Sequence, residues 1–293
     1  GQKFYGSNNH NLQKNLPRSI LMVTLNDVDT GAPLAYMSAN LLSAMRTGAM
    51  PAMAASYLAR KDSKVLSLIG PGVINKCAFQ CYMEVLPEID TLKIRGSSVH
   101  SKSALNMKKF VEENYPQIKN IIICDSLEEA CRDSDVVSEA MSVTKQDMEE
   151  FKMDWFKKGV AVFSMGSFLV RDHESYLGTT MVADNYGMYE KYLKNFIARG
   201  PVDELGRKRE WSIMGIDFVY LVNEKKTERK NVLNLCDIVN GISDGRTSDD
   251  EIVMCSIGGM PIEDLAWGYE CYKKAEEKGI GTKLNLWDEP YYI

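Results

Sequence analysis

A glycine-rich segment, Gly70-Pro71-Gly72-Val73-Ile74-Asn75, is the part of the sequence whose residue types point most directly to a chemistry. It lies between the apolar run Val65–Ile69 and Val73–Val85, whose composition predicts a helix. A glycine turn between a strand and a helix directs backbone N–H groups and the positive end of the helix toward a pyrophosphate. Gly70 permits the tight turn, and Gly72 lets a phosphate approach the main chain. We therefore predict that Gly70, Gly72, Val73, Ile74 and Asn75 bind a dinucleotide.

The loop on its own is also typical of ordinary turns, because Asn75 stands where the dinucleotide fingerprint has its third glycine. The end of the next predicted strand adds information, since NAD-binding proteins usually place a carboxylate there for the ribose. The sequence here is Lys93-Ile94-Arg95-Gly96-Ser97-Ser98, without a carboxylate. Guanidinium and hydroxyl donors match the oxygens of a 2′-phosphate, so Arg95, Ser97 and Ser98 favour NADP over NAD. The alternative is that Arg95 is a solvated residue at a strand end.

The elements that must position this loop alternate between strands and helices from residue 64 onward. Strands are predicted at residues 65–69, 91–94, 121–124, 135–138, 160–163, 181–183 and 252–257. Helices are predicted at residues 73–85, 101–114, 127–132 and 261–278. This alternation is typical of an α/β fold with a Rossmann-type, doubly wound parallel sheet. Further cofactor-binding residues are expected in loops after later strands: Ala140, Met165 and Gly166.

The two chain ends follow a different pattern. Strands are predicted at residues 3–5, 20–25 and 33–37, and a helix at residues 38–60, in which Pro51 marks a break or a new first turn. We expect the C-terminal tail to be packed, because it carries Leu284, Leu286 and Trp287. The ends therefore predict a smaller α+β domain, whereas residues 186–239 show only partial helical character.

Composition limits the classes of partner. The chain has 293 residues and a net charge of -5, so it has no overall basic character that would attract nucleic acid or an anionic membrane, although local basic patches are not excluded; a small-molecule ligand is favoured. Its seven cysteines are scattered and odd in number, which indicates reduced thiols in a cytoplasmic protein. Cys77 and Cys81 have no histidine nearby, so we expect two buried helix cysteines and no metal site. No apolar run approaches the ~18 residues that span a bilayer.

Six further segments carry motifs. They read NDVDTGAPL at residues 26–34, LLSAMRTGA at 41–49, AASYLA at 54–59, DSLEEA at 125–130, DEI at 250–252 and GGMPIED at 258–264. Together with the glycine loop they resemble the ornithine cyclodeaminase/mu-crystallin family over nearly the whole chain, and most closely those members that are labelled as a component of tyramine oxidase. Family members include ornithine cyclodeaminase, alanine dehydrogenase and reductases of cyclic imines, which pass a hydride between an amine or imine carbon and nicotinamide.

The resemblance implies a domain organisation and a substrate site. Residues 62–258 would form the NAD(P)-binding Rossmann domain. Residues 1–61 and 259–293 would form a domain that carries a homodimer interface and part of the substrate site. In the family an arginine and a lysine at the positions of Arg46 and Lys3 hold the substrate carboxylate, because a guanidinium grips it bidentately and an ammonium neutralises it or moves a proton. Without the resemblance, Arg46 is an ordinary helix arginine and Lys3 a surface lysine. Family members usually begin well before the position of Gly1, so the chain looks like the family without its first segments.

One position departs from the family. Cyclodeaminases have a catalytic aspartate after a late strand, and in the corresponding sequence, SMGSFL at residues 164–169, Phe168 stands in its place. A benzyl group neither accepts a proton nor pairs with an ammonium, so the cyclodeaminase reaction is not favoured. Asp172 or His173 could substitute, and we predict Lys3, Arg46 and Asp172 as the catalytic residues.

The favoured function is that of an NAD(P)-dependent reductase or dehydrogenase of an amino or imino acid, acting as a homodimer in the cytoplasm. Two alternatives remain. The chain could be a non-catalytic or partner-dependent subunit of the mu-crystallin type, which Phe168 and the expected lack of the family's first segments favour. It could also be an ornithine cyclodeaminase that converts ornithine to proline and ammonia.

Overall fold

The computed structural model describes residues 1–142, 148–204, 206 and 208–290. The chain forms two compact units. The first unit comprises Gly1–Arg46 and Met260–Ile293, and the second comprises Thr47–Gly259.

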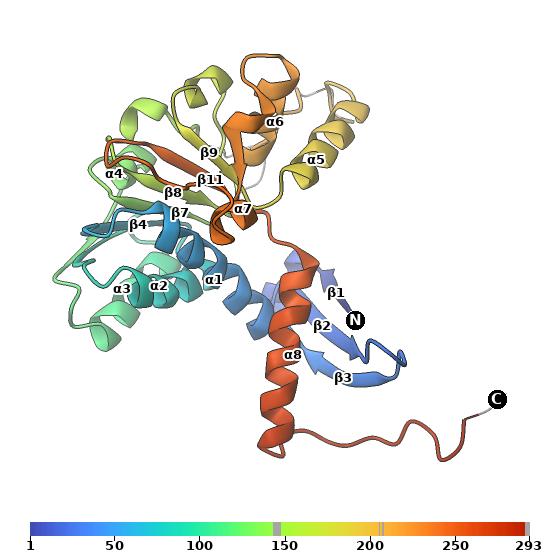
Figure 1. Ribbon diagram of the computed structural model, residues 1–293. Helices are drawn as coiled ribbons and strands as arrows, with labels where there is room; N and C mark the ends of the chain where they lie inside the picture. Colours follow the sequence, from blue (N-terminus) through green and yellow to red (C-terminus); the bar gives the residue numbers. More distant parts are fainter. Residues whose placement is uncertain (143–147, 205, 207, 291–293) are drawn as a thin grey trace. The chain divides into compact units, whose positions relative to one another are not determined.

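The second unit is built on an eight-stranded sheet in the order β10-β9-β11-β8-β7-β4-β5-β6, in which every pair of neighbours is parallel (Figure 1). Its strands are β4 (Val65–Ile69), β5 (Thr91–Arg95), β6 (Asn120–Ile123), β7 (Val136–Glu139), β8 (Ala161–Ser164), β9 (Thr180–Ala183), β10 (Val232–Asn234) and β11 (Val253–Ser256). The chain moves outward from β4 to β6, then returns to the other side of β4 with β7. Ligands of such sheets bind outside the carboxyl ends of the strands at this switch point. The predicted α/β fold with a Rossmann-type sheet is confirmed.

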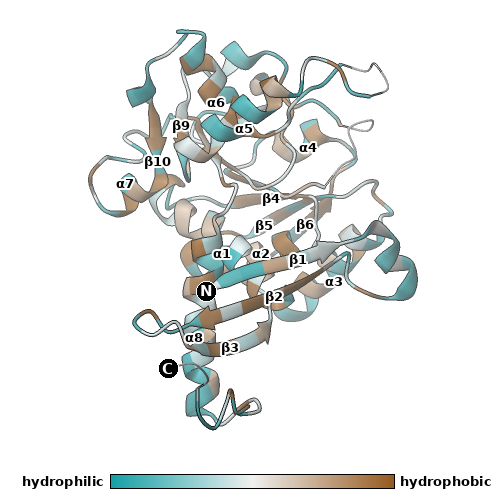
Figure 2. Cartoon of the chain, turned by 90° about the vertical axis from the view of Figure 1, so that its right-hand side faces the viewer, coloured by the Kyte–Doolittle hydropathy of each residue, from teal (hydrophilic) through white to brown (hydrophobic). Residues whose placement is uncertain are grey.

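Helices cover both faces of this sheet, with α2 and α3 on one side and α5 and α6 on the other (Figure 1). The helices of the unit are α2 (Val73–Val85), α3 (Lys102–Asn114), α4 (Leu127–Cys131), α5 (Tyr186–Ala198), α6 (Met214–Asn223) and α7 (Leu235–Val239). Every residue of β7, β8 and β11 is buried, as expected for parallel strands that are covered on both faces. In Figure 2, β10 at the edge of this sheet is also largely brown, although only its first residue is fully buried.

Local signals located most of these elements to within one or two residues. The bounds of α2 agree with the prediction, and Ser126 caps α4, its Oγ accepting a 3.1 Å hydrogen bond from the Glu129 amide. Residues 186–239, which showed no clear pattern, contain α5, α6, β10 and α7. Helix α6 lacks a polar stripe because seven of its ten residues are buried, and a helix of this kind shows little amphipathic period.

The first unit contains an antiparallel sheet in the order β1-β2-β3. Its elements are β1 (Gln2–Ser7), the 3-10 helix η1 (Asn9–Lys14), β2 (Ser19–Asn26), β3 (Pro33–Ser38), the start of α1 (Asn40–Leu58) and α8 (Pro261–Glu277). One face of the sheet contributes Val23 and Leu25 to a small core that includes Leu42 and Leu265. Helix α8, which contributes Leu265, carries both teal and brown segments, as a helix with one buried face does (Figure 2).

Helix α1 passes through Pro51 without interruption, so the predicted break at this residue is wrong. A proline inside a helix removes one N–H donor and crowds the carbonyl four residues back. The residues that follow it, including Ala52, Ala55 and Leu58, are buried in the core of the second unit. Their packing outweighs the local cost of the proline.

The C-terminal tail is exposed, so the prediction that it is packed is also wrong. Leu284 is 87% exposed, Leu286 54% and Trp287 51%. The polar residues Lys283, Asn285 and Asp288 interrupt them, and this segment belongs to no helix or strand, so it presents no continuous apolar face to bury.

Candidate functional site

The glycine loop has the geometry that a phosphate requires. Gly70 has a φ of +78°, a backbone conformation that other residues rarely adopt. A Cβ on this residue would also lie only 2.8 Å from the carbonyl oxygen of Ala140, so both backbone conformation and steric clash exclude a side chain. A Cβ on Gly72 would meet nothing within 4 Å, so the main chain is open to a ligand there. No side chain caps the start of α2, which leaves the first N–H groups of the helix for an anion. The loop therefore fits a dinucleotide pyrophosphate.

Asn75, at the position of the third glycine, holds this loop in place through hydrogen bonds. Its buried amide donates hydrogen bonds to the carbonyl oxygens of Ile69 (2.9 Å), Gly70 (3.1 Å) and Ser138 (3.1 Å), and accepts one from Ser138 Oγ (2.7 Å). These bonds tie the end of β4 to the neighbouring β7. Asn75, which replaces the third glycine of the fingerprint, thus stabilises the loop, and the spacing of the motif alone did not reveal this role.

Arg95 lies at the end of β5 with its side chain turned inward. It is 8% exposed, so the alternative interpretation as a solvated residue is wrong. Its guanidinium donates to the carbonyl of Gly96, and Nη2 lies 3.1 Å from Glu149 Oε1. Ser97 and Ser98, which follow it, are exposed. A ligand phosphate at this guanidinium would compete with Glu149 for its N–H donors.

A buried carboxylate that the sequence patterns did not predict lies at the carboxyl ends of β7 and β8. Glu139 is fully buried, and it accepts hydrogen bonds from the amides of Met141 (2.5 Å), Ser167 (3.0 Å) and Gly166 (3.2 Å) and from Ser164 Oγ (2.8 Å). Burial raises the pKa of Glu139 to about 7, although these four bonds act in the opposite direction. The only signal in the sequence was an acidic residue at the end of an apolar strand.

Glu139 lies among the residues predicted to contact the cofactor. Gly70 approaches Ala140, the Met165 amide donates a 2.8 Å bond to the Glu139 carbonyl, and Gly166 binds its carboxylate. Four residues from three separate loops therefore meet at the switch point.

In the first unit, Lys3 and Arg46 converge on one carboxylate. Lys3 Nζ lies 2.6 Å from Asp264 Oδ2, and Arg46 Nε lies 3.1 Å from Asp264 Oδ1. Arg46 Nη1 is also 2.8 Å from Glu263 Oε2. Asp264 is completely buried, whereas the Lys3 and Arg46 side chains are each 13% exposed. The sequence predicted the two cations but not Asp264, which lies in the GGMPIED motif at the start of α8.

The residues after β8 fall into two environments. Phe168 is fully buried and stacks on Phe151, with ring centroids 4.0 Å apart, so it belongs to the core. Asp172 is exposed at the start of the 3-10 helix η3 (His173–Tyr176). His173 Nδ1 lies 3.0 Å from the buried Asp217, and pairing with this carboxylate raises the pKa of His173.

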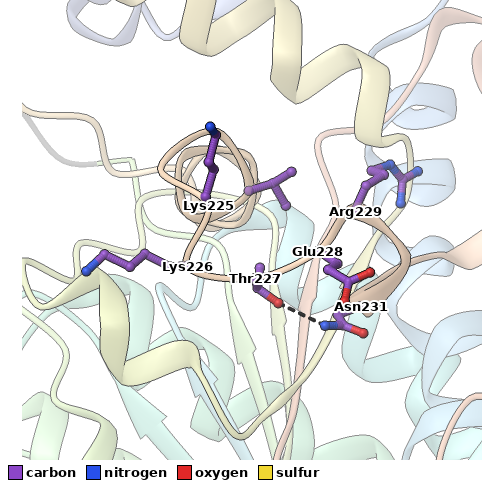
Figure 3. Close-up of a pocket in the computed structure, with 7 residues that line it drawn as sticks. Lys225, Lys226, Thr227, Glu228, Arg229 and Asn231 are labelled. Atoms are coloured by element: carbon purple, nitrogen blue, oxygen red, sulfur yellow. Dashed lines mark hydrogen bonds between the residues drawn. The ribbon is translucent and has the colours of Figure 1, made fainter.

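A hollow on the loop after α6, lined by Val222 and residues 225–229 and 231, does not form a comparable site (Figure 3). Lys225, Lys226 and Arg229 point in different directions. Lys226 pairs with Glu174 at 2.9 Å, and Arg229 lies over the Tyr186 ring at 3.8 Å. These cations are therefore not arranged to hold one anion.

Neither a metal centre nor a membrane span is present in the described part of the chain. Its residues contain no group of three or more His, Cys, Asp or Glu side chains that could hold a metal ion. Within the same ranges, no helix has the length and apolar character that crossing a membrane requires.

Comparison with known proteins identifies the family. The family model described as "Ornithine cyclodeaminase/mu-crystallin family" matches residues 1–279. The chain belongs to this family. A relative in it, N-((2S)-2-amino-2-carboxyethyl)-L-glutamate dehydrogenase of Staphylococcus aureus (strain NCTC 8325 / PS 47), is 29% identical over 98% of this chain and 78% of its own length.

Solved structures of this ornithine cyclodeaminase/mu-crystallin family share the fold. Thermococcus litoralis Delta(1)-pyrroline-2-carboxylate reductase, in complex with NADH and L-proline, is 28% identical with a TM-score of 0.74, covering 96% of this chain and 80% of that one. An archaeal alanine dehydrogenase dimer with bound NAD is 25% identical with a TM-score of 0.77, covering 97% and 80%. These relatives are dehydrogenases and reductases of amino or imino acids.

Proposed function

We propose that this chain is a nicotinamide-dependent reductase or dehydrogenase of an amino or imino acid. The observation that carries the proposal is the convergence of Lys3 and Arg46 on one buried carboxylate, which sets two cations side by side. The activities of the relatives support the same class of reaction.

The cofactor is assigned to the second unit. In the loop of Gly70, Gly72, Val73, Ile74 and Asn75, the N–H groups of the last three residues would hold the pyrophosphate, because those of Gly70 and Gly72 donate to carbonyls of the protein. Ala140, Met165 and Gly166 would line the nicotinamide half. A bound nicotinamide supplies or accepts the hydride. In this proposal residues 62–258 form the cofactor domain, and residues 1–61 and 259–293 form the substrate and dimerisation domain.

The substrate carboxylate is assigned to Arg46 and Lys3. The bonds of Arg46 to Asp264 and Glu263 engage two of the five N–H donors of the guanidinium, and in the described part of the chain the others are left for a ligand. Lys3 Nζ can neutralise the carboxylate or give a proton to the substrate nitrogen. Asp172, which is exposed, is the second candidate for this proton transfer.

NADP is the favoured form of the cofactor within this proposal. Arg95 is a cation at the end of β5, followed by the exposed Ser97 and Ser98. A 2′-phosphate would replace Glu149 as the partner of the guanidinium. Titration with NADH and NADPH tests this choice, and an Arg95→Ala variant should lose affinity for NADPH while keeping its affinity for NADH.

The activity is tested by incubating the protein with each reduced cofactor and a panel of cyclic and linear imino acids. Arg46→Lys and Lys3→Met should each raise the KM roughly ten- to hundredfold, because a charge-assisted hydrogen bond contributes about 1.5–3 kcal/mol. Lys14→Met is the matched control, since Lys14 is an exposed lysine of the same unit. Cofactor fluorescence checks that each variant still binds its dinucleotide.

A wild-type protein that binds the cofactor but reduces no member of the panel would contradict the enzymatic proposal and favour a non-catalytic role. The cyclodeaminase alternative predicts ammonia release from ornithine. The side chain of Phe168, at the position of the catalytic aspartate of cyclodeaminases, is buried and has no proton-accepting group, so the cyclodeaminase reaction is disfavoured.

We also propose a homodimer. The face of the three-stranded sheet that carries Phe4, Ile20 and Tyr36 exposes 45%, 47% and 67% of these residues. An apolar patch of this kind is typical of a protein interface, and a relative is described as a dimer. Light scattering should therefore give twice the mass of the chain, and Tyr36→Lys should shift it toward the monomer.

A further inference from the structure

Three loops of the second unit interlock at the carboxyl ends of β4, β7 and β8. A Cβ on Gly70 would lie 2.8 Å from the Ala140 oxygen, and a Cβ on Gly166 would lie 2.4 Å from the Met141 oxygen. Both approaches are too close for any side chain, so each glycine is required where two loops meet. The sheet register places Glu139 between them, opposite Ile69 of β4 and Ser164 of β8.

The carboxylate of Glu139 joins two of these loops. Oε1 accepts from the amides of Met141 and Ser167, and Oε2 accepts from Ser164 Oγ and the Gly166 amide. A carboxylate has about four acceptor sites, and all of them are used here. The side chain is 0% exposed, and no lysine, arginine or histidine of the described residues forms an ion pair with it.

Burying a carboxylate without a cation is costly, and only well-directed hydrogen bonds offset the cost. The loops that supply the donors must therefore be held in fixed positions around the Glu139 carboxylate. They are the loop after β7 and the loop after β8, which lie on the side of the switch point that receives the second nucleotide of a dinucleotide in a Rossmann sheet.

We propose that Glu139 is a positioning residue of the cofactor site, which fixes the loop of Met165–Ser167 against the loop of Ala140 and Met141 so that both present their main chain to the nicotinamide half. Glu139 does not touch the cofactor, since it is buried and its acceptor sites are filled. This inference rests on the proposed function, because it assumes that a dinucleotide binds.

Glu139→Gln tests the role with almost no change of shape. The amide nitrogen of glutamine is a donor. If it takes the place of Oε2, it can donate to the Ser164 hydroxyl but loses the bond from the Gly166 amide; if it takes the place of Oε1, it loses the bonds from the Met141 and Ser167 amides. The control is Asp135→Asn, at the residue that precedes the same strand; unlike Glu139, Asp135 also pairs with a lysine, Lys157, at 2.7 Å. Asp135 Oδ2 accepts from the amides of Lys64 (2.8 Å) and Val65 (2.9 Å), so it is also a carboxylate that binds backbone, but at the amino end of the sheet.

The readout is the dissociation constant of NADH and of NADPH, measured by fluorescence titration. We expect Glu139→Gln to weaken the preferred cofactor about tenfold or more, and Asp135→Asn to leave it within about twofold. Hydrogen exchange should show faster exchange at the Gly166 and Ser167 amides in Glu139→Gln alone. If Glu139→Gln does not fold, Glu139→Asp, which keeps the charge but withdraws it by one methylene, takes its place with the same expectation.

Equal cofactor affinity in the wild type and in a folded Glu139 variant overturns this inference and leaves the proposed function intact. Equal weakening in the Asp135 control also overturns it, because the effect would then be one of general stability. A wild-type protein that binds neither dinucleotide refutes the proposed function itself, and the positioning role falls with it.

Discussion

Glu139 should make the stability of the second unit depend on pH. Its pKa is about 7 in the folded chain against 4.5 for an ordinary glutamate, because burial disfavours the charged form. A group whose pKa is raised by folding binds its proton more tightly in the folded state. Its contribution is therefore fully present below about pH 4.5 and is lost as the pH rises through about 7. Since one pKa unit corresponds to about 1.4 kcal/mol, the change over this window is about 3 kcal/mol.

The assay compares urea unfolding of the wild type and Glu139→Gln between about pH 4.5 and 8, followed by the fluorescence of Trp155 and Trp211 in the same unit. The difference in the free energy of unfolding, wild type minus variant, should fall by about 3 kcal/mol as the pH rises. Taking the difference cancels other groups, such as Asp135, whose pKa is lowered because its bonds from Lys157 and from the amides of Lys64 and Val65 together outweigh the effect of burial. Two parallel curves would refute the reasoning, because they would mean that Glu139 does not titrate in this range.

Three further predictions concern other bonds of the same unit. The pKa of His173, measured by NMR, should lie above 6.5 and should fall in the variant Asp217→Asn. The charged form of His173 should stabilise the fold below about pH 6.5, and this stabilisation should be lost as the pH rises through the folded pKa. An unchanged titration curve in the variant would exclude the pair. Asn75→Gly restores the third glycine but removes the bonds to three carbonyls, so the free energy of unfolding should drop by about 1–3 kcal/mol in urea titrations. Ser126→Ala should cost about 1 kcal/mol in the same assay, with Ser126→Asp as the control that keeps a cap.

Sequence patterns predicted the elements whose signals are local. The strand, glycine turn and helix from Val65 to Val85 are specified by neighbouring residues, and the cap at Ser126 needs only the next three. Helix α6 was not predicted because most of its residues are buried and apolar, which leaves no polar stripe. Pro51 led to a wrong prediction because local cost and tertiary packing act in opposite directions there, and the packing decides.

Some residues of the candidate sites were predicted from the sequence, whereas the partners that they contact were not. Lys3 and Arg46 were found through the family resemblance, but Asp264 was not, because it lies 261 residues from Lys3 in the sequence. Arg95 was interpreted as a residue that awaits a ligand, whereas the fold supplies Glu149 as its partner. Glu139 had no charged neighbour in the sequence to mark it. Pairings of this kind depend on contacts between distant segments, which a single sequence does not display.

The cluster of Lys3, Arg46, Asp264 and Glu263 contains two cations and two anions. Their charges balance before any ligand arrives, so the cluster projects little field into the solvent. An anionic ligand is then held by short-range contact and receives little long-range steering. Its association rate should consequently change little with ionic strength, in contrast to sites that draw in ligands through uncompensated charge.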